Sequence, residues 1–453
     1  MRRFLSAVFL AVVCATGAAA DSLHDAASAI EHGDFALATQ LLLPLADQGN
    51  PDAQVKLGAM YALGLGVAQD FQESLRLFRL AAENGNAQAQ YNLGLIYRDG
   101  VGVPQDYQEA LKWLRKATEQ GFAWAQLDLG VLYHDGLGVR QNYQEALKWF
   151  QLAAEQGNAP AQYTLGLMYY KGQSVPKNAQ KAVKWLRKAA EQGYAQAQGD
   201  LSVMYLGGKG VPQDNQEALK WFRLAAEQGN AGAQHNLGVL YHDGLGVTQD
   251  YQEALKWFRL AAEQGLAKAQ DSLAGMFRDG LGTSQDYQEA VKWYRLAAEQ
   301  GLAQAQYNLG FMYDQGQGVP ENSQEAVIWI RKAVEQGYAQ AQFFLGLMYT
   351  QGGQGVPEDN QQAAIWFRKA AEQGHTSAQN SMGVMYEKGK GVPQDFVRAH
   401  MWYSVGARVL SDDEARLSMK QRDRVVLRMT ASQLKKAQEM ARRCQETKFK
   451  ECG

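Results

Sequence analysis

Tryptophan recurs along this 453-residue chain at a nearly constant interval of 36 residues. The spacing lengthens by one residue before Trp366, where GGQG at 352–355 replaces the GLG or GVG of other copies. Trp124 lies outside the series. A fixed period of this length predicts a repeat protein in which every unit packs on its neighbours. The series is Trp113, Trp149, Trp185, Trp221, Trp257, Trp293, Trp329, Trp366 and Trp402.

The first half of one unit, NAQAQYNLGLIYRDG at 86–100, has the pattern of a helix. Ala89, Leu93 and Tyr97 recur every four residues and share one helical face. Gly94 beside them permits close approach of a neighbouring helix. Gly100 supplies a positive-φ end to the helix, and the turn that follows contains Pro104.

The second half predicts another helix. Asp106 is an expected N-cap, and Glu109 three residues later completes a capping-box pattern. Trp113 belongs to the apolar stripe of this helix, so we interpret the tryptophan series as core packing rather than as a path for sugars or electrons. Two helices of about 13 residues are marginal alone, so each unit must bury its stripe on its neighbours. The capping pattern recurs at Asp70/Glu73, Asn142/Glu145, Asp214/Glu217, Asp250/Glu253, Asp286/Glu289 and Asn322/Glu325.

The consensus AxAQxxLGxxYxxGxGVxxDxxxAxxWxxxAAEQG resembles the Sel1-like repeat, a relative of the tetratricopeptide repeat. Ten units of 36–37 residues match it over 50–407. The resemblance implies an all-α fold, an α-solenoid of helix-turn-helix repeats that serves as a protein-binding scaffold. The periodicity by itself predicts the same architecture.

Both ends depart from the repeat. The segment 21–49 is expected to form a degenerate N-terminal capping repeat, in which Pro44 interrupts the second helix. At 408–453 we expect a tail with one capping helix that begins at Thr430, has Gln433 in a capping box and ends near Arg443.

The first twenty residues have the order of a secretory signal peptide. Arg2 and Arg3 precede an apolar run, and small residues follow it up to Ala20. We expect cleavage after about Ala20 and a periplasmic or secreted mature chain without membrane insertion. Cys14 follows Val rather than the small residue typical of lipid-attachment sites, so it is assigned to the leader. In an oxidising compartment the remaining two cysteines, Cys444 and Cys452, are expected to form a disulfide, against the alternative of two exposed thiols.

Charge and motifs exclude several classes of function. The mature chain has 43 Lys and Arg against 47 Asp and Glu, without the overall basic excess of a nucleic-acid binder. His235 and His242 lie about 10 Å apart along one helix, too far to share a metal ion. We therefore expect no metal and no cofactor. Ser174 and Ser432 begin S-x-x-K matches, but the other motifs of a β-lactam hydrolase are missing.

The positions that vary between repeats point to a binding surface. The third, sixth, tenth and thirteenth residues of each first-helix segment form one stripe, turned away from the Ala/Leu/Tyr stripe. In related solenoids this face lines a concave groove. Aromatic and Arg side chains dominate binding hot spots, whereas drift at solvated positions would not accumulate aromatics. The predicted groove residues are Tyr91, Arg98, Trp124, His134, Tyr163, Tyr170, His235, His242, Arg278, Tyr307, Phe311 and Phe343.

The sequence thus predicts a monomeric, non-catalytic exported scaffold that binds a protein or peptide through its concave groove. Cell-wall glycan or a host factor is the alternative ligand, because aromatic rings also stack on sugars. A β-lactam or cell-wall hydrolase is the enzyme alternative. We expect no catalytic residue.

Overall fold

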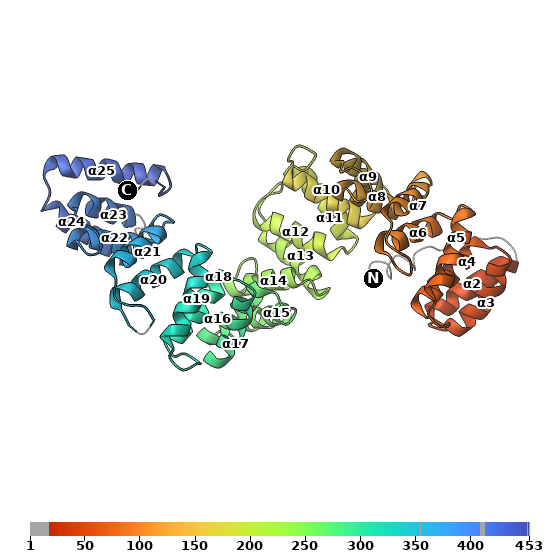
Figure 1. The fold of residues 1–453 in the computed structure, drawn as a ribbon, viewed down its shortest axis with the longest axis horizontal. Helices are drawn as coiled ribbons and strands as arrows, with labels where there is room; N and C mark the ends of the chain where they lie inside the picture. The colour runs from red at the N-terminus through yellow and green to blue at the C-terminus, as the bar shows by residue number, and fades with distance from the viewer. Residues whose placement is uncertain (1–17, 354, 408–412, 451, 453) are drawn as a thin grey trace. The chain divides into compact units, whose positions relative to one another are not determined.

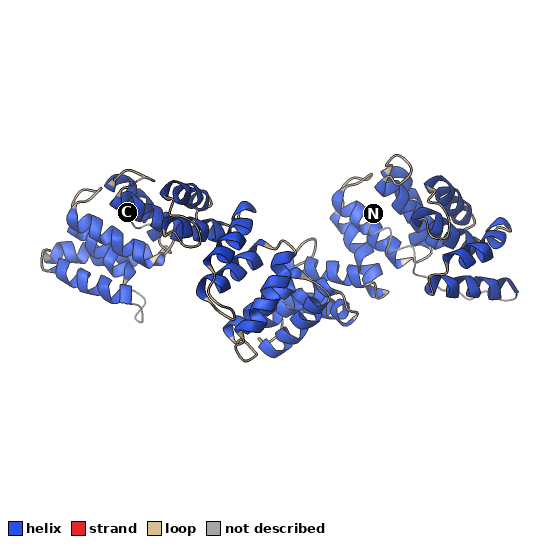
Figure 2. Ribbon diagram, turned by 90° about the horizontal axis from the view of Figure 1, so that it is seen from below, coloured by secondary structure: helices blue, strands red, loops and turns tan. Residues whose placement is uncertain are grey.

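The computed structural model describes residues 18–353, 355–407, 413–450 and 452. These residues form 24 helices and, in this described part, no strand (Figure 2). The helices follow one another as antiparallel pairs in an α-solenoid (Figure 1), which confirms the predicted fold class. The chain divides into two compact units, residues 1–228 and 229–453.

The first unit contains α2 (Ala18–Glu31), α3 (Phe35–Asp47), α4 (Pro51–Leu63), α5 (Phe71–Glu83), α6 (Ala87–Asp99), α7 (Tyr107–Glu119), α8 (Ala123–Asp135), α9 (Tyr143–Glu155), α10 (Ala159–Lys171), α11 (Ala179–Glu191), α12 (Ala195–Leu206) and α13 (Asn215–Glu227).

The second unit contains α14 (Ala231–Asp243), α15 (Tyr251–Glu263), α16 (Ala267–Asp279), α17 (Tyr287–Glu299), α18 (Ala303–Asp314), α19 (Ser323–Glu335), α20 (Ala339–Gln351), α21 (Asn360–Ala371), α22 (Thr376–Lys388), α23 (Phe396–Gly406), α24 (Asp413–Val426) and α25 (Ala431–Glu446).

The α6–α7 pair shows how a repeat is built. Gly100 ends α6 in the left-handed conformation, with φ 68°, and its N–H donates to the carbonyl of Ile96. Gly94 lies so close to α7 that a Cβ there would stand 2.7 Å from the side chain of Leu114. Such contact explains a glycine in mid-helix, where its intrinsic cost is about 1 kcal/mol.

The expected capping boxes are only half formed. Asp106 Oδ1 accepts from the backbone N–H groups of Gln108 and Glu109, as an N-cap should. The Glu109 carboxylate does not return to the cap. It accepts instead from Lys112 Nζ at 2.8 Å and from Trp113 Nε1 at 3.1 Å, which lie on the same helical face. The reciprocal arrangement forms at Thr430 and Gln433.

The tryptophans pack as structural residues to different degrees. Trp113, Trp221 and Trp402 are buried, whereas the other members of the 36-residue series are half-buried. Lys116 Nζ lies 4.6 Å from the ring of Trp113, so a cation covers its outer face.

Buried glutamines join each repeat to the next. Gln90 Nε2 donates to the carbonyl of Ala82 at 3.1 Å, and Gln90 Oε1 accepts from Gln120 Nε2 at 2.8 Å. Each glutamine pair joins the first helix of a repeat to the end of the second helix of the same repeat. It also gives the buried side-chain amide a hydrogen-bond partner. The pair recurs as Gln126/Gln156, Gln162/Gln192, Gln198/Gln228, Gln234/Gln264, Gln270/Gln300, Gln306/Gln336 and Gln342/Gln373.

At the N-terminal end, the expected interruption at Pro44 is wrong. Helix α3 continues through Pro44 to Asp47. Proline removes the N–H that would bond to the carbonyl of Gln40, but both residues are exposed, so water can satisfy that carbonyl. Most of the predicted leader lies outside the described residues, and α2 begins at Ala18, before the expected cleavage point.

The C-terminal end contains one helix more than the sequence predicts. Helix α24 precedes α25, and both pack on α23. Helix α25 runs to Glu446 and buries Ala437, Ala441 and Cys444. A disulfide joins Cys444 to Cys452, and both cysteines belong to the last core cluster.

Candidate functional site

Tyr91 and Arg98 do not form an accessible groove. Only 3% of Tyr91 is exposed, and its hydroxyl donates to Asp128 Oδ2 at 2.9 Å. Arg98 Nη1 donates to the other oxygen of Asp128 at 2.7 Å, and Arg98 also pairs with Asp99. Burial raises the pKa of Tyr91, so the hydroxyl keeps its proton and remains a donor. The prediction for these two residues is corrected: they hold α6 to α8, since Asp128 lies one repeat further on.

Trp124 and His134 lie on the same helix as Asp128 but do not meet. Trp124 is half-buried against the core cluster of the first repeats. His134 is 41% exposed at its side chain, with Nδ1 2.6 Å from Asp135 Oδ1 and its ring edge-on to Tyr143.

Tyr163 makes the Tyr91 contact in a more open form. Its hydroxyl donates to Asp200 Oδ2 at 3.0 Å, and its ring lies 5.2 Å from that of Tyr194. Both Tyr163 and Asp200 are half-buried. Burial raises the pKa of Asp200 although the bond from Tyr163 opposes it. Tyr170 accepts from Lys209 Nζ at 3.2 Å.

The histidines His235 and His242 face different neighbours. His235 Nε2 lies 3.3 Å from Ser272 Oγ, and burial lowers the pKa of this histidine. His242 Nδ1 lies 2.6 Å from Asp243 Oδ1, and its ring contacts Tyr251. Among the described residues, no group of three or more His, Cys, Asp and Glu side chains is placed to hold a metal ion.

Arg278 lies near a buried carboxylate on α16. Arg278 pairs with Asp279 at 2.7 Å. Asp271, two stripe positions earlier, accepts from Gln304 Nε2 at 2.9 Å and from Asn308 Nδ2 at 3.0 Å, both on α18. Burial raises the pKa of Asp271 to about 6, against the bond from Asn308 and the charge of Arg278.

The densest aromatic cluster lies on α18 and α20. The ring of Tyr307 is 6.4 Å from Phe311, 5.8 Å from Tyr338 and 6.0 Å from Phe344, and Phe311 is 5.7 Å from Phe344. All four side chains are half-buried, so each keeps an exposed portion. We call Tyr307, Phe311, Tyr338 and Phe344 the aromatic cluster.

Phe343 contacts its own helical pair and the start of the next one. Its ring is 5.6 Å from Phe367 on α21 and stacks at 4.6 Å on His375, the N-cap residue of α22. It is therefore a half-buried packing residue of α20, and it does not join the aromatic cluster.

A second period, of two repeats, organises these contacts, and the 36-residue pattern alone does not reveal it. Tyr91, Tyr163, His235 and Tyr307 are 72 residues apart, or two repeats. Tyr91, Tyr163 and His235 each form a hydrogen bond with the residue 37 positions later, which lies in the next repeat. Comparing alternate repeats, rather than all repeats together, would have found the partners Asp128, Asp200 and Ser272.

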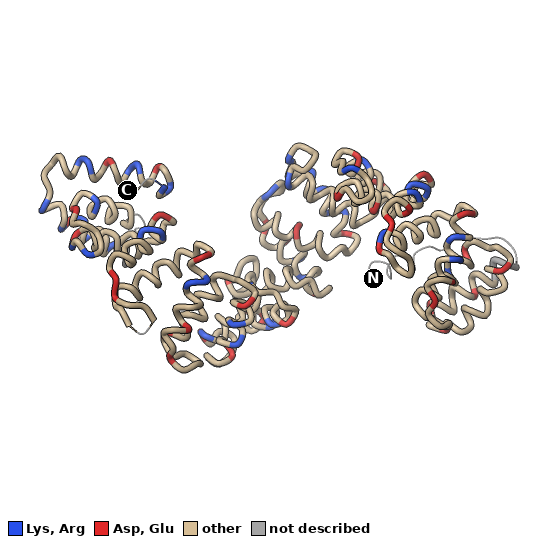
Figure 3. Tube along the Cα trace, viewed as in Figure 1, with Lys and Arg blue, Asp and Glu red and all other residues tan. Residues whose placement is uncertain are grey.

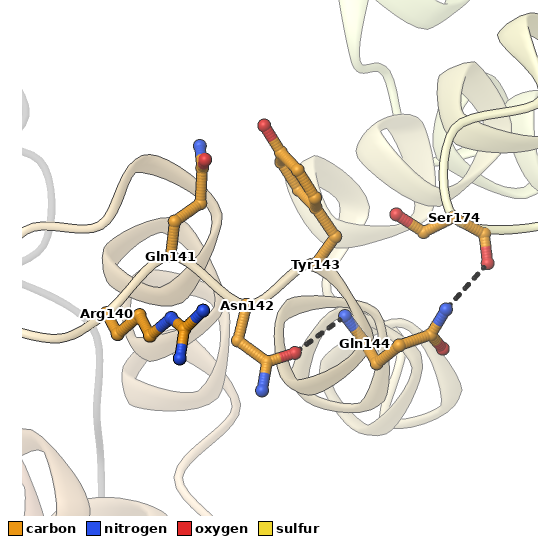
Figure 4. A pocket seen from close by; sticks show the side chains of 6 residues that line it. All are labelled: Arg140, Gln141, Asn142, Tyr143, Gln144 and Ser174. Carbon is orange, nitrogen blue, oxygen red and sulfur yellow. Dashed lines mark hydrogen bonds between the residues drawn. The ribbon is translucent and has the colours of Figure 1, made fainter.

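An open depression of about 590 Å³ lies between two inter-helix turns (Figure 4). Its lining consists of Arg140, Gln141, Asn142, Tyr143, Gln144 and Ser174.

The side chains around this depression do not form a catalytic arrangement that would support the hydrolase alternative. Ser174 sits in a turn with φ 62°, and its carbonyl accepts from Gln144 Nε2 at 3.4 Å (Figure 4). The six lining residues include no carboxylate, imidazole or amine that could act as general base. Ser432 and Lys435 are both exposed near the start of α25.

The repeat pattern and its helical pairs match a known family model. The model, described as Sel1 repeat, matches ten successive segments between residues 51 and 408. The chain belongs to the Sel1-repeat family. Sel1-repeat proteins typically act as non-catalytic scaffolds for protein interactions.

Two solved Sel1-repeat structures are similar to this chain. One is c5321, a protective antigen present in uropathogenic Escherichia coli strains, with 37% identity, coverage of 96% of this chain and 93% of that chain, and a TM-score of 0.83. The other is a Sel1 repeat protein from Oxalobacter formigenes, with 35% identity, coverage of 75% and 97%, and a TM-score of 0.52. None of the curated proteins compared with the chain matches it. No helix in the described part of the chain is long and apolar enough to cross a membrane.

Proposed function

We propose that this chain is an exported, non-catalytic scaffold that binds a protein or peptide through the first-helix surface of its Sel1 repeats. The aromatic cluster on α18 and α20 is the centre of that surface. Four partly exposed aromatic rings, each within 6.4 Å of at least one other, carry this proposal. Large aromatic side chains contribute most of the free energy at protein interfaces.

The surface around the cluster supports a peptide ligand. Asp314 is half-buried at the end of α18, and the Gln340 side-chain amide donates to the Tyr307 hydroxyl at 3.4 Å. Polar groups at the edge of an apolar centre are the usual anatomy of a protein interface. Cell-wall glycan is the second candidate ligand, because the same rings could stack on sugars.

A capture experiment tests the surface. The mature chain and a variant carrying Tyr307→Ser, Phe311→Ser and Phe344→Ser would be used as bait in envelope extract and on purified peptidoglycan. A matched variant carries Leu260→Ser, Leu296→Ser and Ile328→Ser, which removes exposed apolar side chains from second helices. Circular dichroism and thermal unfolding must show that all three chains are folded.

The outcomes are distinct. Loss of a captured protein by the cluster variant, with retention by the matched variant, supports the proposed surface. Peptidoglycan retention that depends on the cluster supports the glycan ligand instead. Equal capture by all three chains contradicts a site on this surface.

Export rests on the signal-like N-terminal segment, and it agrees with the description of the 37%-identical relative as a protective antigen. N-terminal sequencing of the protein from fractionated cells should give Asp21 in the periplasmic or secreted fraction. A chain that begins at Met1 in the cytoplasmic fraction contradicts export.

A further inference from the structure

Charge is segregated at the C-terminal end of the described chain. Residues 413–450, from the start of α24, contain 11 Lys and Arg but five Asp and Glu, whereas the rest of the mature chain contains 32 basic and 42 acidic residues. The whole-chain balance therefore conceals a strongly basic segment. Ten of its 11 basic side chains are exposed, and Arg422 is half-exposed. Lys and Arg positions recur along α25 in the backbone trace (Figure 3).

The fold turns one face of α25 outward. Ala437, Ala441 and Cys444 are buried toward α23. Lys435, Lys436, Glu439, Arg442, Arg443 and Glu446 are exposed on the remaining surface. Because packing on α23 fixes the buried stripe of α25, it also fixes the direction in which the basic side chains of this helix face.

Two large apolar side chains of this basic segment are exposed, Leu417 at 46% and, far more fully, Leu427. Leu427, in the connection between α24 and α25, is 86% exposed. The next most exposed large apolar side chain, Ile328, is 48% exposed. Leu427 is followed by Arg428, and Arg424 stands three residues before it. A leucine at this level of exposure gains almost no free energy of burial from the fold.

Neighbouring acidic groups neutralise only part of this charge. Arg424 Nη2 lies 2.7 Å from Glu387 Oε1, Arg422 pairs with Asp423 at 2.7 Å, and Arg442 lies 4.0 Å from Glu446. Arg428 covers the ring of Phe396 at 5.2 Å. Counted together with Glu387, the basic residues of 413–450 still outnumber the acidic ones by 11 to six.

We propose that α24, Leu427 and α25 form a docking surface for a membrane that contains anionic phospholipid. The Lys and Arg side chains meet the phosphate headgroups, and Leu427 enters the boundary between headgroups and acyl chains. A cluster of exposed Lys and Arg side chains is attracted to anionic headgroups, and an apolar side chain among them can insert at the boundary between headgroups and acyl chains. This surface is separate from the first-helix site of the proposed function.

Vesicle sedimentation tests the proposal with the whole mature chain. The probes are vesicles of phosphatidylcholine alone and of phosphatidylcholine mixed with phosphatidylglycerol. We expect binding to the mixed vesicles alone, weakened by added salt. Neutralisation by Arg428→Gln, Lys435→Gln and Lys436→Gln should lower the binding constant by about tenfold or more. The matched control carries Lys220→Gln, Lys256→Gln and Lys292→Gln, three exposed lysines of second helices, and should bind normally.

The leucine has its own readout. A fluorophore attached at Leu427→Cys should shift its emission to the blue on mixed vesicles, whereas one at Leu260→Cys should not. Equal binding to both vesicle types overturns the proposal. An equal loss of vesicle binding in the Arg428/Lys435/Lys436 variant and in its matched control also overturns it. Absence of vesicle binding together with salt-sensitive binding to polyglutamate also overturns it and assigns the basic surface to an acidic protein.

Discussion

The Tyr163 hydroxyl donates a hydrogen bond to Asp200 Oδ2 at 3.0 Å, joining α10 to the first helix of the next repeat. Tyr163→Phe removes the donor and leaves a half-buried carboxylate less well satisfied. We expect a loss of about 1–2 kcal/mol in the free energy of unfolding. Urea unfolding monitored by circular dichroism measures it. Tyr170→Phe is the control, because its hydroxyl bonds only to the exposed Lys209, and it should cost less.

Two mid-helix glycines should respond to alanine in opposite directions. A Cβ on Gly199 would meet nothing within 4 Å, whereas one on Gly94 would stand 2.7 Å from Leu114. Gly199→Ala should therefore stabilise the chain by about 0.5–1 kcal/mol, through helix propensity. Gly94→Ala should destabilise it by about 1–3 kcal/mol, because α6 and α7 must separate. Thermal unfolding of both variants checks the pair, and a change of the same sign in both would contradict the packing argument.

Asp271 should make stability depend on pH. Its pKa is about 6 in the folded chain against 3.8 for an ordinary Asp, and burial is the main cause. Between these values the folded chain binds more protons than the unfolded chain, so the free energy of unfolding falls as pH rises from about 4 to 6. The fall is on the order of 2 kcal/mol.

Comparison with Asp271→Asn isolates this contribution, since asparagine does not titrate. Urea midpoints of the two chains between pH 4.5 and 7.5 should diverge, with the wild type losing relative stability as pH rises. Arg278 remains charged in both chains throughout this range. Parallel midpoints would show that Asp271 titrates normally in the folded chain.

The glutamine pairs should be energetically coupled. Gln162→Ala removes a buried amide that bonds to Ala154 and Gln192, and we expect a cost of about 1–3 kcal/mol. Gln192→Ala removes an exposed partner and should cost about 0.5–1 kcal/mol. The double variant should lose less than the two single losses together. Simple additivity in this cycle would indicate that the bond contributes no measurable energy.

Loss of the disulfide should act locally. Cys444→Ser with Cys452→Ser opens a loop spanning eight residues and should cost about 2–3 kcal/mol. The loss should appear at α25, so trypsin should cut after Arg442 and Arg443 faster than in the wild type. Cleavage rates within α14–α17 provide the control and should not change. Uniform acceleration throughout the second unit would show that the bond supports more than the capping helix.

The sequence determined the features that depend on neighbours within one helix or turn. The 36-residue period, the Asp106 cap and the left-handed Gly100 follow from local backbone requirements, which residue type reveals directly. Pro44 shows the limit of local rules, because its cost depends on whether Gln40 is exposed.

The tertiary structure decided which side chains are accessible. Tyr91 and Tyr163 occupy the same position two repeats apart, yet Tyr91 is buried and Tyr163 is half-buried. The difference comes from residues elsewhere in the repeat and in the next one, where Arg98 and Tyr91 close on Asp128 together. The exposure of Leu427 likewise follows from how α24 and α25 pack on α23. Exposure depends on contacts between residues distant in the chain, and a periodic pattern read along one chain does not contain them.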